Sequence, residues 1–516
     1  MKTLAIFAVF AVQGLVAQDT TWTSYGGGHN SWRYSDLSDI NTSNVAKLSP
    51  QWIFQSNSQR LQTVPLVLGG LMYATGSQNA AFALDLVTGK QMWRYEKRIP
   101  EGTMGCCGTP NRGFAVSGDK LFKVNYEGVL VALDAKSGAT LWETQVANYK
   151  AGYSLTVAPQ VVKDKVIIGN AGAEFGTRGF VDAYSIVTGE RLWRFNTTAG
   201  PEDPKAMATW SGDSWKRGGG STWVTGSYDP ETDTIFWGTG NPGPDMVGDV
   251  REGDNLYTCS LVAIDPNTGK LKWHYQFTPH DVHDYDASED LPLVDLKIGG
   301  KTVKAVIQAN RNGVFYTLDR TNGKVLVAKP YTKVDWMTGM DANGRPIMVA
   351  KKEPTKEGNL ACPGLPGGHN WWPTTYSPQT GLYYFSSRDG CQIFYRHDAE
   401  YKEGQWYQLS NPRGVPGEVA AGSINAVDPT TGETRWRIET TNPPSGGFLT
   451  TGGGLLFIGD RDGYFIAIDA KTGKVLWKFQ TGQGISAGAV SYKFRGKQYI
   501  AVAAGSNIIT FALPEL

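Results

Sequence analysis

Two neighbouring cysteines, Cys106 and Cys107, stand in the stretch GCCG at residues 105–108. The chain has only five cysteines, and glycines flank this pair on both sides. A disulfide between adjacent cysteines cannot join distant parts of a fold, so the stabilising role of an ordinary disulfide does not explain the pair. The two thiols therefore raise the question of a local function.

Oxygen-bearing side chains gather in stretches that occur once in the chain. They are Glu174, Asn241, Asp284 and Asp286, in GNAGAEFGTRG (169–179), GTGNPGPD (238–245) and TPHDVHDYD (278–286). Carboxylate and amide oxygens suit a hard cation such as calcium, and a more highly charged cation favours an additional carboxylate. No His and Cys cluster has zinc spacing, and no Cys-x-x-Cys-His motif indicates covalent haem. The alternative is a fold whose loops are merely acidic.

A recurring phrase indicates the elements that position these residues. It consists of an apolar strand, a turn rich in Asp, Thr and Gly, and a second strand ending in tryptophan, which predicts a β-hairpin. Six copies end at Trp93, Trp142, Trp193, Trp273, Trp436 and Trp477, and a degenerate copy occupies residues 317–326. The undisturbed spacing of roughly 40 to 55 residues suits a four-stranded propeller blade.

The remaining segments complete this pattern. The two wider gaps between copies of the phrase contain hairpin-like sequences at residues 227–241 and 375–387, which fits blades with longer insertions. Strands at 496–514 and the tryptophan strand at 47–54 supply an eighth blade, and their pairing would leave no open sheet edge. We therefore predict an all-β, single eight-bladed β-propeller of four-stranded antiparallel blades over residues 45–516, with residues 18–44 as a leading arm.

The repeat tryptophans are expected to dock neighbouring blades. Function must then come from residues that break the repeat, in loops at one end of the central channel.

The first 17 residues have the layout of a secretory signal, with a lysine, an apolar stretch too short to span a bilayer and small residues. We expect cleavage after about Ala17, with a retained anchor as the alternative, and a periplasmic mature chain without a membrane span. Such an oxidising compartment permits disulfides. The net charge of +1, without basic blocks, argues against nucleic acid or an anionic membrane as a partner.

From about residue 20 to its end, the chain resembles the pyrroloquinoline quinone (PQQ)-dependent alcohol dehydrogenases of the methanol/ethanol family. The motifs GCCG…NRG, GAEFGTRGFVDAY, WKRGGG, GTGNPGPD, TPHD…D and ANRNG match that family in order. The resemblance implies a secreted eight-bladed quinoprotein. It also implies that Cys106 and Cys107 form a ring disulfide on one face of the planar quinone, and that Trp223 stacks on the other face. Free or metal-binding thiols are the alternative.

The resemblance also implies roles at the edge of the cofactor. The family contacts the carboxylates and carbonyls of the quinone at positions that match Gln62, Arg112, Thr156, Gly172, Ala173, Ser221 and Asn370. The planar donor fork of arginine suits a carboxylate.

Further matches concern the metal and the chemistry. Glu174 and Asn241 match metal ligands, Asp284 matches the catalytic base beside the metal, and Arg311 matches the guanidinium near the reactive carbonyl. Asp286 resembles the extra carboxylate of the lanthanide-dependent branch. If this segment is extended, Asp284 and Asp286 face the same way and reach one ion. We expect a lanthanide, with calcium as the alternative.

The chain departs from the family at several positions. Gln62 replaces a frequent Glu, Ala171 replaces a small hydroxyl residue, and Ser445 stands where methanol-oxidising members have Trp. These changes bear on cofactor affinity and substrate range more than on the fold. His283 replaces the aromatic residue before the base, and we expect it to be a solvated loop imidazole rather than a pocket-lining group.

The other cysteines have separate expectations. Cys362 and Cys391 match a second disulfide of the family, which would close a loop of about 30 residues and stabilise the fold by ~3 kcal/mol. Cys259 is left over, and we expect a buried small hydrophobic residue.

The sequence thus predicts PQQ-dependent oxidation of a small alcohol to an aldehyde, with a separate soluble cytochrome c as electron acceptor because the chain has no haem motif. One alternative is a quinoprotein acting on sugars or aldoses, which usually lacks the adjacent cysteines. Another is a non-catalytic propeller scaffold, which explains the tryptophan phrases but not the cysteine pair together with Glu174 and Asp284. The alcohol and the oligomeric state, a homodimer included, stay open.

Overall fold

The computed structural model describes residues 19–515, so the predicted signal at 1–17 lies outside the described residues. Regular structure in the described range is almost entirely strand. The helical elements there are short: α1 (Pro204–Met207), η1 (Val45–Lys47), η2 (Tyr149–Ala151), η3 (Ala173–Phe175), η4 (Ser214–Arg217) and η5 (Asp249–Arg251). Across residues 19–515, none has the length and apolar character that a membrane-spanning helix requires.

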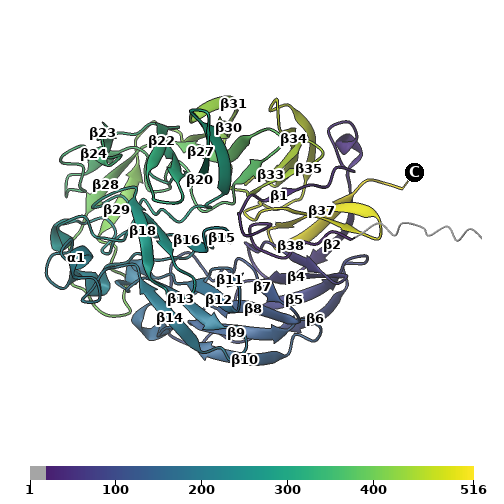
Figure 1. Ribbon diagram of the computed structural model, residues 1–516, viewed down its shortest axis with the longest axis horizontal. Helices are drawn as coiled ribbons and strands as arrows, with labels where there is room; N and C mark the ends of the chain where they lie inside the picture. The colour runs from purple at the N-terminus through teal and green to yellow at the C-terminus, as the bar shows by residue number, and fades with distance from the viewer. Residues whose placement is uncertain (1–18, 516) are drawn as a thin grey trace, which may run out of the picture.

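Four-stranded antiparallel sheets follow one another around the molecule (Figure 1). The first four are β3–β6 (Leu66–Leu68, Leu71–Thr75, Ala81–Asp85, Gln91–Tyr95), β7–β10 (Ala115–Ser117, Lys120–Asn125, Val129–Asp134, Thr140–Gln145), β11–β14 (Gln160–Val162, Lys165–Gly169, Phe180–Ser185, Arg191–Asn196) and β15–β18 (Ser227–Asp229, Thr234–Gly238, Ser260–Ile264, Leu271–Gln276).

Further sheets complete the circuit. They are β19–β22 (Leu293–Ile298, Lys301–Ala309, Val314–Asp319, Val325–Pro330), β26-β27-β30-β31 (Thr375–Ser377, Leu382–Asp389, Ala421–Asp428, Glu433–Thr440), β2-β38-β37-β36 (Ser49–Gln55, Asn507–Ala512, Lys497–Ala504, Val490–Phe494) and the five-stranded β1-β32-β33-β34-β35 (Tyr34–Ser35, Phe448–Thr451, Leu455–Gly459, Tyr464–Asp469, Val475–Gln480). Two small sheets are insertions: β23-β24 (Met337–Met340, Pro346–Met348) and β25-β28-β29 (Asn359–Ala361, Gln392–Arg396, Ser410–Gly414).

Each copy of the recurring phrase forms the last two strands of a sheet, as predicted. The turn residues explain the hairpins. In the first copy, Asp85 Oδ1 accepts hydrogen bonds from the backbone N–H groups of Val87 and Thr88, and Gly89 adopts a φ of 69°. An Asp side chain thus closes the turn, and glycine takes the left-handed position without a Cβ clash.

The tryptophan of one phrase packs against the turn of the next. Trp93 Nε1 donates to the carbonyl of Ala135 at 3.0 Å, and a Cβ added to Gly138 would lie 2.6 Å from the Trp93 ring. Trp193 Nε1 donates in the same way to the carbonyl of Pro266 at 3.0 Å. These contacts join consecutive sheets.

The two wider gaps contain first hairpins rather than separate sheets. Residues 227–238 form β15 and β16, and residues 375–389 form β26 and β27, each pairing with the later strands of its own sheet. An all-β fold built from four-stranded antiparallel sheets is therefore confirmed.

The two ends of the chain share one sheet. Strand β2 pairs antiparallel with β38, with Trp52 opposite Thr510. Figure 1 shows the purple β2 beside the yellow strands β37 and β38. The predicted pairing of the terminal strands is thus observed, with β2 as the outer strand of this sheet.

The segment before β2 is built into the body of the molecule. Trp22 forms a β-bridge with Val67, and β1 adds to β32 as a parallel strand. The Arg33 guanidinium forms a buried ion pair with Asp290 at 2.8 Å. This segment therefore touches sheets that lie far apart in the sequence.

Candidate cofactor and metal site

A cavity of about 530 Å³ gathers nearly all of the predicted site residues. Fourteen of the fifteen line it: Gln62, Cys106, Cys107, Arg112, Thr156, Gly172, Glu174, Ser221, Trp223, Asn241, Asp284, Asp286, Arg311 and Asn370. Ala173, the exception, is buried next to Gly172 in η3. The residues come from nine separate connections between strands, which the circuit of sheets brings together at one place.

The adjacent cysteines are bonded to each other. Cys106 and Cys107 form a disulfide in the cavity wall, so the alternative of free thiols is wrong. The second expected disulfide, between Cys362 and Cys391, is also present with an S–S distance of 2.04 Å. Cys259 is free and buried, as expected.

Aromatic rings form much of the wall. Trp223, Trp371, Trp372 and Trp406 line the cavity, and the last three were not among the predicted site residues. The guanidinium carbon of Arg112 lies 4.7 Å from the ring centre of Trp223 and 4.9 Å from that of Trp371. Flat apolar faces of this kind suit a flat ring system.

Polar groups without partners face the same space. Arg112 Nη1 donates to Thr156 Oγ1 at 2.7 Å, but Arg112 Nε is buried and unpaired. Burial lowers the pKa of Arg112 to about 10. Gln62 Oε1 is likewise buried without a hydrogen-bond partner. Buried unpaired donors and acceptors are unfavourable, so both residues fit a polar ligand such as the edge of a carboxylated quinone.

An acidic edge surrounds Arg311. Its Nη2 contacts Asp284 Oδ2 at 2.8 Å, and its Nη1 contacts Asp286 Oδ2 at 2.9 Å. Asp286 also accepts from the Trp223 indole at 3.2 Å and from the backbone N–H of Asn241 at 2.7 Å. One guanidinium thus bridges the two aspartates that the motif predicted to be neighbours.

The charges at this edge are not balanced. Burial, with a smaller contribution from the charge of Asp286, raises the pKa of Glu174 to about 7. Burial also raises the pKa values of Asp284 and Asp286, although Arg311 opposes this. For Arg311 burial lowers the pKa, but the charges of Asp284 and Asp286 outweigh it and raise the pKa. A bound cation would offset the mutual repulsion of these carboxylates.

The predicted metal ligands line one cavity, but their side chains do not converge on a single coordination position. Across residues 19–515, no three Asp, Glu, His or Cys side chains converge as a ready-made metal site. The donor chemistry nevertheless fits a hard cation, because carboxylates and the Asn241 amide share the same wall.

The segment around the two aspartates is not extended, so the condition under which they would face the same way is not met. No strand covers residues 278–292, and Asp284 has a φ of 64°. The cause is Asp281, whose carboxylate accepts from the backbone N–H groups of His283 and Tyr285 and so closes a turn. The turn, rather than strand alternation, directs Asp284 and Asp286 to Arg311.

The expectation for His283 is wrong. Its side chain is buried rather than solvated, and its Nε2 lies 2.9 Å from the carbonyl of Lys352. The ring packs against Tyr285 and Phe394. His283 does not line the cavity, and its contacts pack the turn that carries Asp284 against the rest of the protein.

Sequence reasoning missed several residues of this region. Gln408 lines the cavity. Asp245 does not line it, but it is a buried carboxylate whose pKa is raised by burial and by the charges of Glu174 and Asp286. Trp371, Trp372 and Asp245 stand in stretches that break the repeat, which was the available signal. Trp406 and Gln408 carry no such signal, because they lie in an insertion between β28 and β29.

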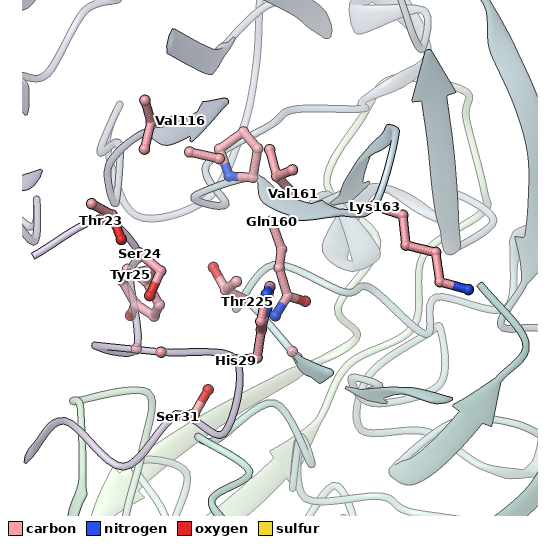
Figure 2. Close-up of a pocket in the computed structure, with 15 residues that line it drawn as sticks. Thr23, Ser24, Tyr25, His29, Ser31, Val116, Gln160, Val161, Lys163 and Thr225 are labelled. Atoms are coloured by element: carbon pink, nitrogen blue, oxygen red, sulfur yellow. The ribbon is translucent and has the colours of Figure 1, made fainter. Parts of the chain in front are cut away.

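A second cavity of about 340 Å³ lies beneath the N-terminal segment (Figure 2). Figure 2 shows Tyr25, His29 and Ser31 on one side and Gln160 and Thr225 near them. Burial raises the pKa of Tyr25, and its hydroxyl is close enough to Arg112 for their charges to interact. The N-terminal segment therefore lies near Arg112, which lines the first cavity.

Comparison with known proteins gives a consistent result. A family model described as "Glucose/ethanol/alcohol dehydrogenase, beta-propeller domain" matches residues 22–336. A second model, "Outer membrane protein assembly factor BamB", matches residues 420–513.

Individual relatives match over most of their length. The quinoprotein alcohol dehydrogenase PedH of Pseudomonas putida is 40% identical over 507 residues, which cover 93% of this chain and 85% of PedH. The lanthanide-dependent methanol dehydrogenase of Methylacidiphilum fumariolicum is 36% identical over 518 residues, which cover 94% of this chain and 84% of the relative. The solved structure of a europium-containing methanol dehydrogenase superposes with a TM-score of 0.91 at 33% identity, covering 96% of this chain and 98% of that one.

Proposed function

The chain belongs to the PQQ-dependent alcohol dehydrogenases, an all-β propeller family, and we propose that it oxidises a small alcohol to an aldehyde in the cavity described above. The observation that carries this proposal is the convergence of fourteen of the fifteen predicted site residues on one cavity, whose wall includes the Cys106–Cys107 disulfide. Neither a scaffold nor a generic β-propeller requires that convergence.

PQQ, when bound, supplies a two-electron acceptor, and a cation supplies Lewis acidity. The chain's own residues bind the cofactor and orient it. The disulfide and Trp223 offer apolar faces, while Arg112 and Gln62 offer unpaired polar groups for the cofactor's edge. Gly172 and Ser221 also line the cavity, Thr156 Oγ1 accepts a hydrogen bond from Arg112, and Ala173 is buried beside Gly172.

Asp284 accepts the hydroxyl proton of the alcohol in this proposal. Its carboxylate lies in the cavity and is held by Arg311 at 2.8 Å. Burial raises its pKa, which makes the carboxylate a better base. Arg311, held in turn by Asp286, is positioned to stabilise negative charge that develops nearby.

The proposed cation ligands are Glu174, Asn241, Asp284 and Asp286, and the proposed ion is a lanthanide rather than calcium. The presence of Asp286 in the cavity wall supports an ion of higher charge, because each carboxylate adds attraction for it. The lanthanide-dependent and europium-containing relatives are consistent with this choice.

Several further proposals follow from the family. The sheets that make up the circuit are the eight blades of one propeller over residues 45–516, docked by the repeat tryptophans, and residues 18–44 are its arm. Residues 1–17 direct the chain to the periplasm. A separate soluble cytochrome c accepts the electrons.

The first test replaces Asp284 by Asn. We expect turnover to fall by about 10²- to 10⁴-fold, because the amide does not accept the proton. PQQ binding, followed by absorbance, should remain within a few-fold of the original. A turnover number close to that of the unchanged enzyme would refute the role of Asp284 as base.

The second test reconstitutes metal-free protein with PQQ and with either calcium or a light lanthanide. Dye-linked activity is expected mainly with the lanthanide. Restoration by calcium alone would contradict the choice of ion but not the alcohol dehydrogenase function. A parallel panel of alcohols and aldoses separates the proposed reaction from sugar oxidation.

A further inference from the structure

Asp245 is a buried acid without a partner. Its exposed fraction is 1%, and among the described residues neither carboxylate oxygen accepts a hydrogen bond of normal geometry, although the Asn241 amide lies beside it. It ends the stretch GTGNPGPD, four residues after Asn241. An unpaired buried carboxylate is unfavourable unless something balances its charge, so this side chain needs an explanation.

The neighbouring Arg251 supplies only part of that balance, because its charge lowers the pKa of Asp245 but does not outweigh burial. Arg251 Nε donates to the carbonyl of Pro244 at 3.2 Å, and its Nη1 donates to Asn255 Oδ1 at 2.7 Å. Its Nη2 donates to the carbonyl of Asp281 and, at 3.4 Å, to the backbone carbonyl of Asp245. Arg251 therefore fixes the backbone around Asp245 and forms no salt bridge with its carboxylate.

The neighbours of Asp245 belong to the proposed cation site. Burial, followed by the charges of Glu174 and Asp286, raises the pKa of Asp245 well above its usual value, while the Asn241 side chain beside it lowers the pKa. The intervening loop packs against η3, which carries Glu174, since a Cβ built on Gly243 would lie 3.5 Å from the carbonyl oxygen of Ala173. Asp245 thus lies on the Glu174 and Asn241 side of the acidic edge.

We propose that Asp245 is a further carboxylate of the cation site, and that its charge makes the site prefer a trivalent over a divalent ion. This inference rests on the proposed function. The attraction between a fixed charge and an ion scales with the charge of the ion, so one added carboxylate stabilises a trivalent ion about one and a half times as strongly as a divalent one.

The test measures ion affinity rather than activity. Terbium is titrated into metal-free protein and followed by its luminescence, which nearby tryptophans sensitise, and calcium affinity is obtained by competition. Asp245→Asn keeps the size of the side chain and removes its charge. If calcium binding weakens about tenfold, terbium binding should weaken about thirtyfold, so the preference for terbium falls about threefold.

The matched control is Asp249→Asn in the same loop. Asp249 is exposed and pairs with Arg396 at 2.8 Å, so its substitution should leave both affinities unchanged. Asp245→Glu retains the charge and should keep most of the preference. If Asp245→Asn does not fold, Asp245→Ser is titrated in its place.

An unchanged ratio of terbium to calcium affinity in Asp245→Asn would overturn the inference, because a neutral carboxylic acid with a packing role gives that result. A failure of the proposed cation site looks different. In that case Glu174→Gln and Asp286→Asn would also leave terbium binding unchanged.

Discussion

At the scale of single residues, the cavity depends on groups whose charge state is set by burial. His369 precedes Asn370 of the cavity wall and is almost completely buried. Its Nδ1 lies 2.7 Å from the carbonyl of Ser386, and its Nε2 lies 3.2 Å from that of Trp372. Burial outweighs these carbonyls and lowers the pKa of His369 to about 4. The folded protein therefore holds a neutral imidazole.

This predicts a loss of stability in acid. Because the folded-state pKa lies below the unfolded value of 6.5, the contribution of His369 is complete above about pH 6.5 and is lost as the pH falls toward about 4. The full loss is about 3 kcal/mol in the free energy of unfolding. Urea unfolding at about pH 7.5 and about pH 4.5 should show a smaller decrease for His369→Gln than for the unchanged protein. Equal decreases would contradict the prediction.

Individual residues also show where sequence reasoning stops. Fourteen residues that the family resemblance predicted line one cavity. Twelve of them stand in stretches that break the repeat, whereas Gln62 and Thr156 do not. The motif matches did not predict the burial of His283 or the left-handed backbone of Asp284. Both depend on contacts with residues far away in the chain, such as Lys352 and Phe394, which no local pattern reports.

At the scale of elements, the turn η3 holds the cavity wall by close backbone packing. Gly172 precedes η3 with a φ of 113°, and a Cβ added there would lie 2.3 Å from the carbonyl oxygen of Gly152. Only glycine accommodates both the backbone conformation and the close approach. Glu174 in the same turn depends on this contact for its position.

Gly172→Ala is therefore expected to lower PQQ affinity by about tenfold or more and to destabilise the fold, because the Gly152 carbonyl must move. Gly118→Ala is the matched control. Gly118 also has a positive φ, 58°, but nothing lies within 4 Å of its added Cβ. It should lose only about 1 kcal/mol of stability and retain PQQ affinity. Equal PQQ affinities in the two variants would count against the prediction.

The elements themselves were the most predictable part of the fold. The recurring phrase contains the residues that form its turn, as Asp85 illustrates by accepting a hydrogen bond from the backbone N–H of Thr88. It also contains the tryptophan that contacts the next sheet, as Trp93 illustrates by donating to the carbonyl of Ala135. The small sheets β23-β24 and β25-β28-β29 were not predicted, since their insertions carry no repeat. Trp406 and Gln408 lie in such an insertion, and for that reason they were missed.

At the scale of the whole molecule, the N-terminal segment ties distant sheets together. The Arg33 guanidinium pairs with Asp290 at 2.8 Å with both side chains buried. Asp290 also accepts from the backbone N–H of Thr374, next to the loop that carries Trp371 and Trp372. One ion pair thus connects the arm, the segment after Asp286 and the cavity wall.

Arg33→Met should lower the free energy of unfolding by about 3–5 kcal/mol, because it leaves Asp290 buried and unpaired. Adding Asp290→Asn removes the unpaired charge and should recover a large part of the loss. Thermal unfolding of both variants checks this. Additive losses in the double variant would show that the two residues do not act as a pair.

The shared sheet of β2 and β38 also governs the order in which the protein can mature. The ribosome delivers β2 more than 400 residues before β38, so β2 has no strand to pair with until β38 has been made. Early termination products would expose a bare strand to proteases and to other chains. We therefore expect chains that stop before β38 to be degraded or to aggregate more readily than chains in which β2 and β38 are paired.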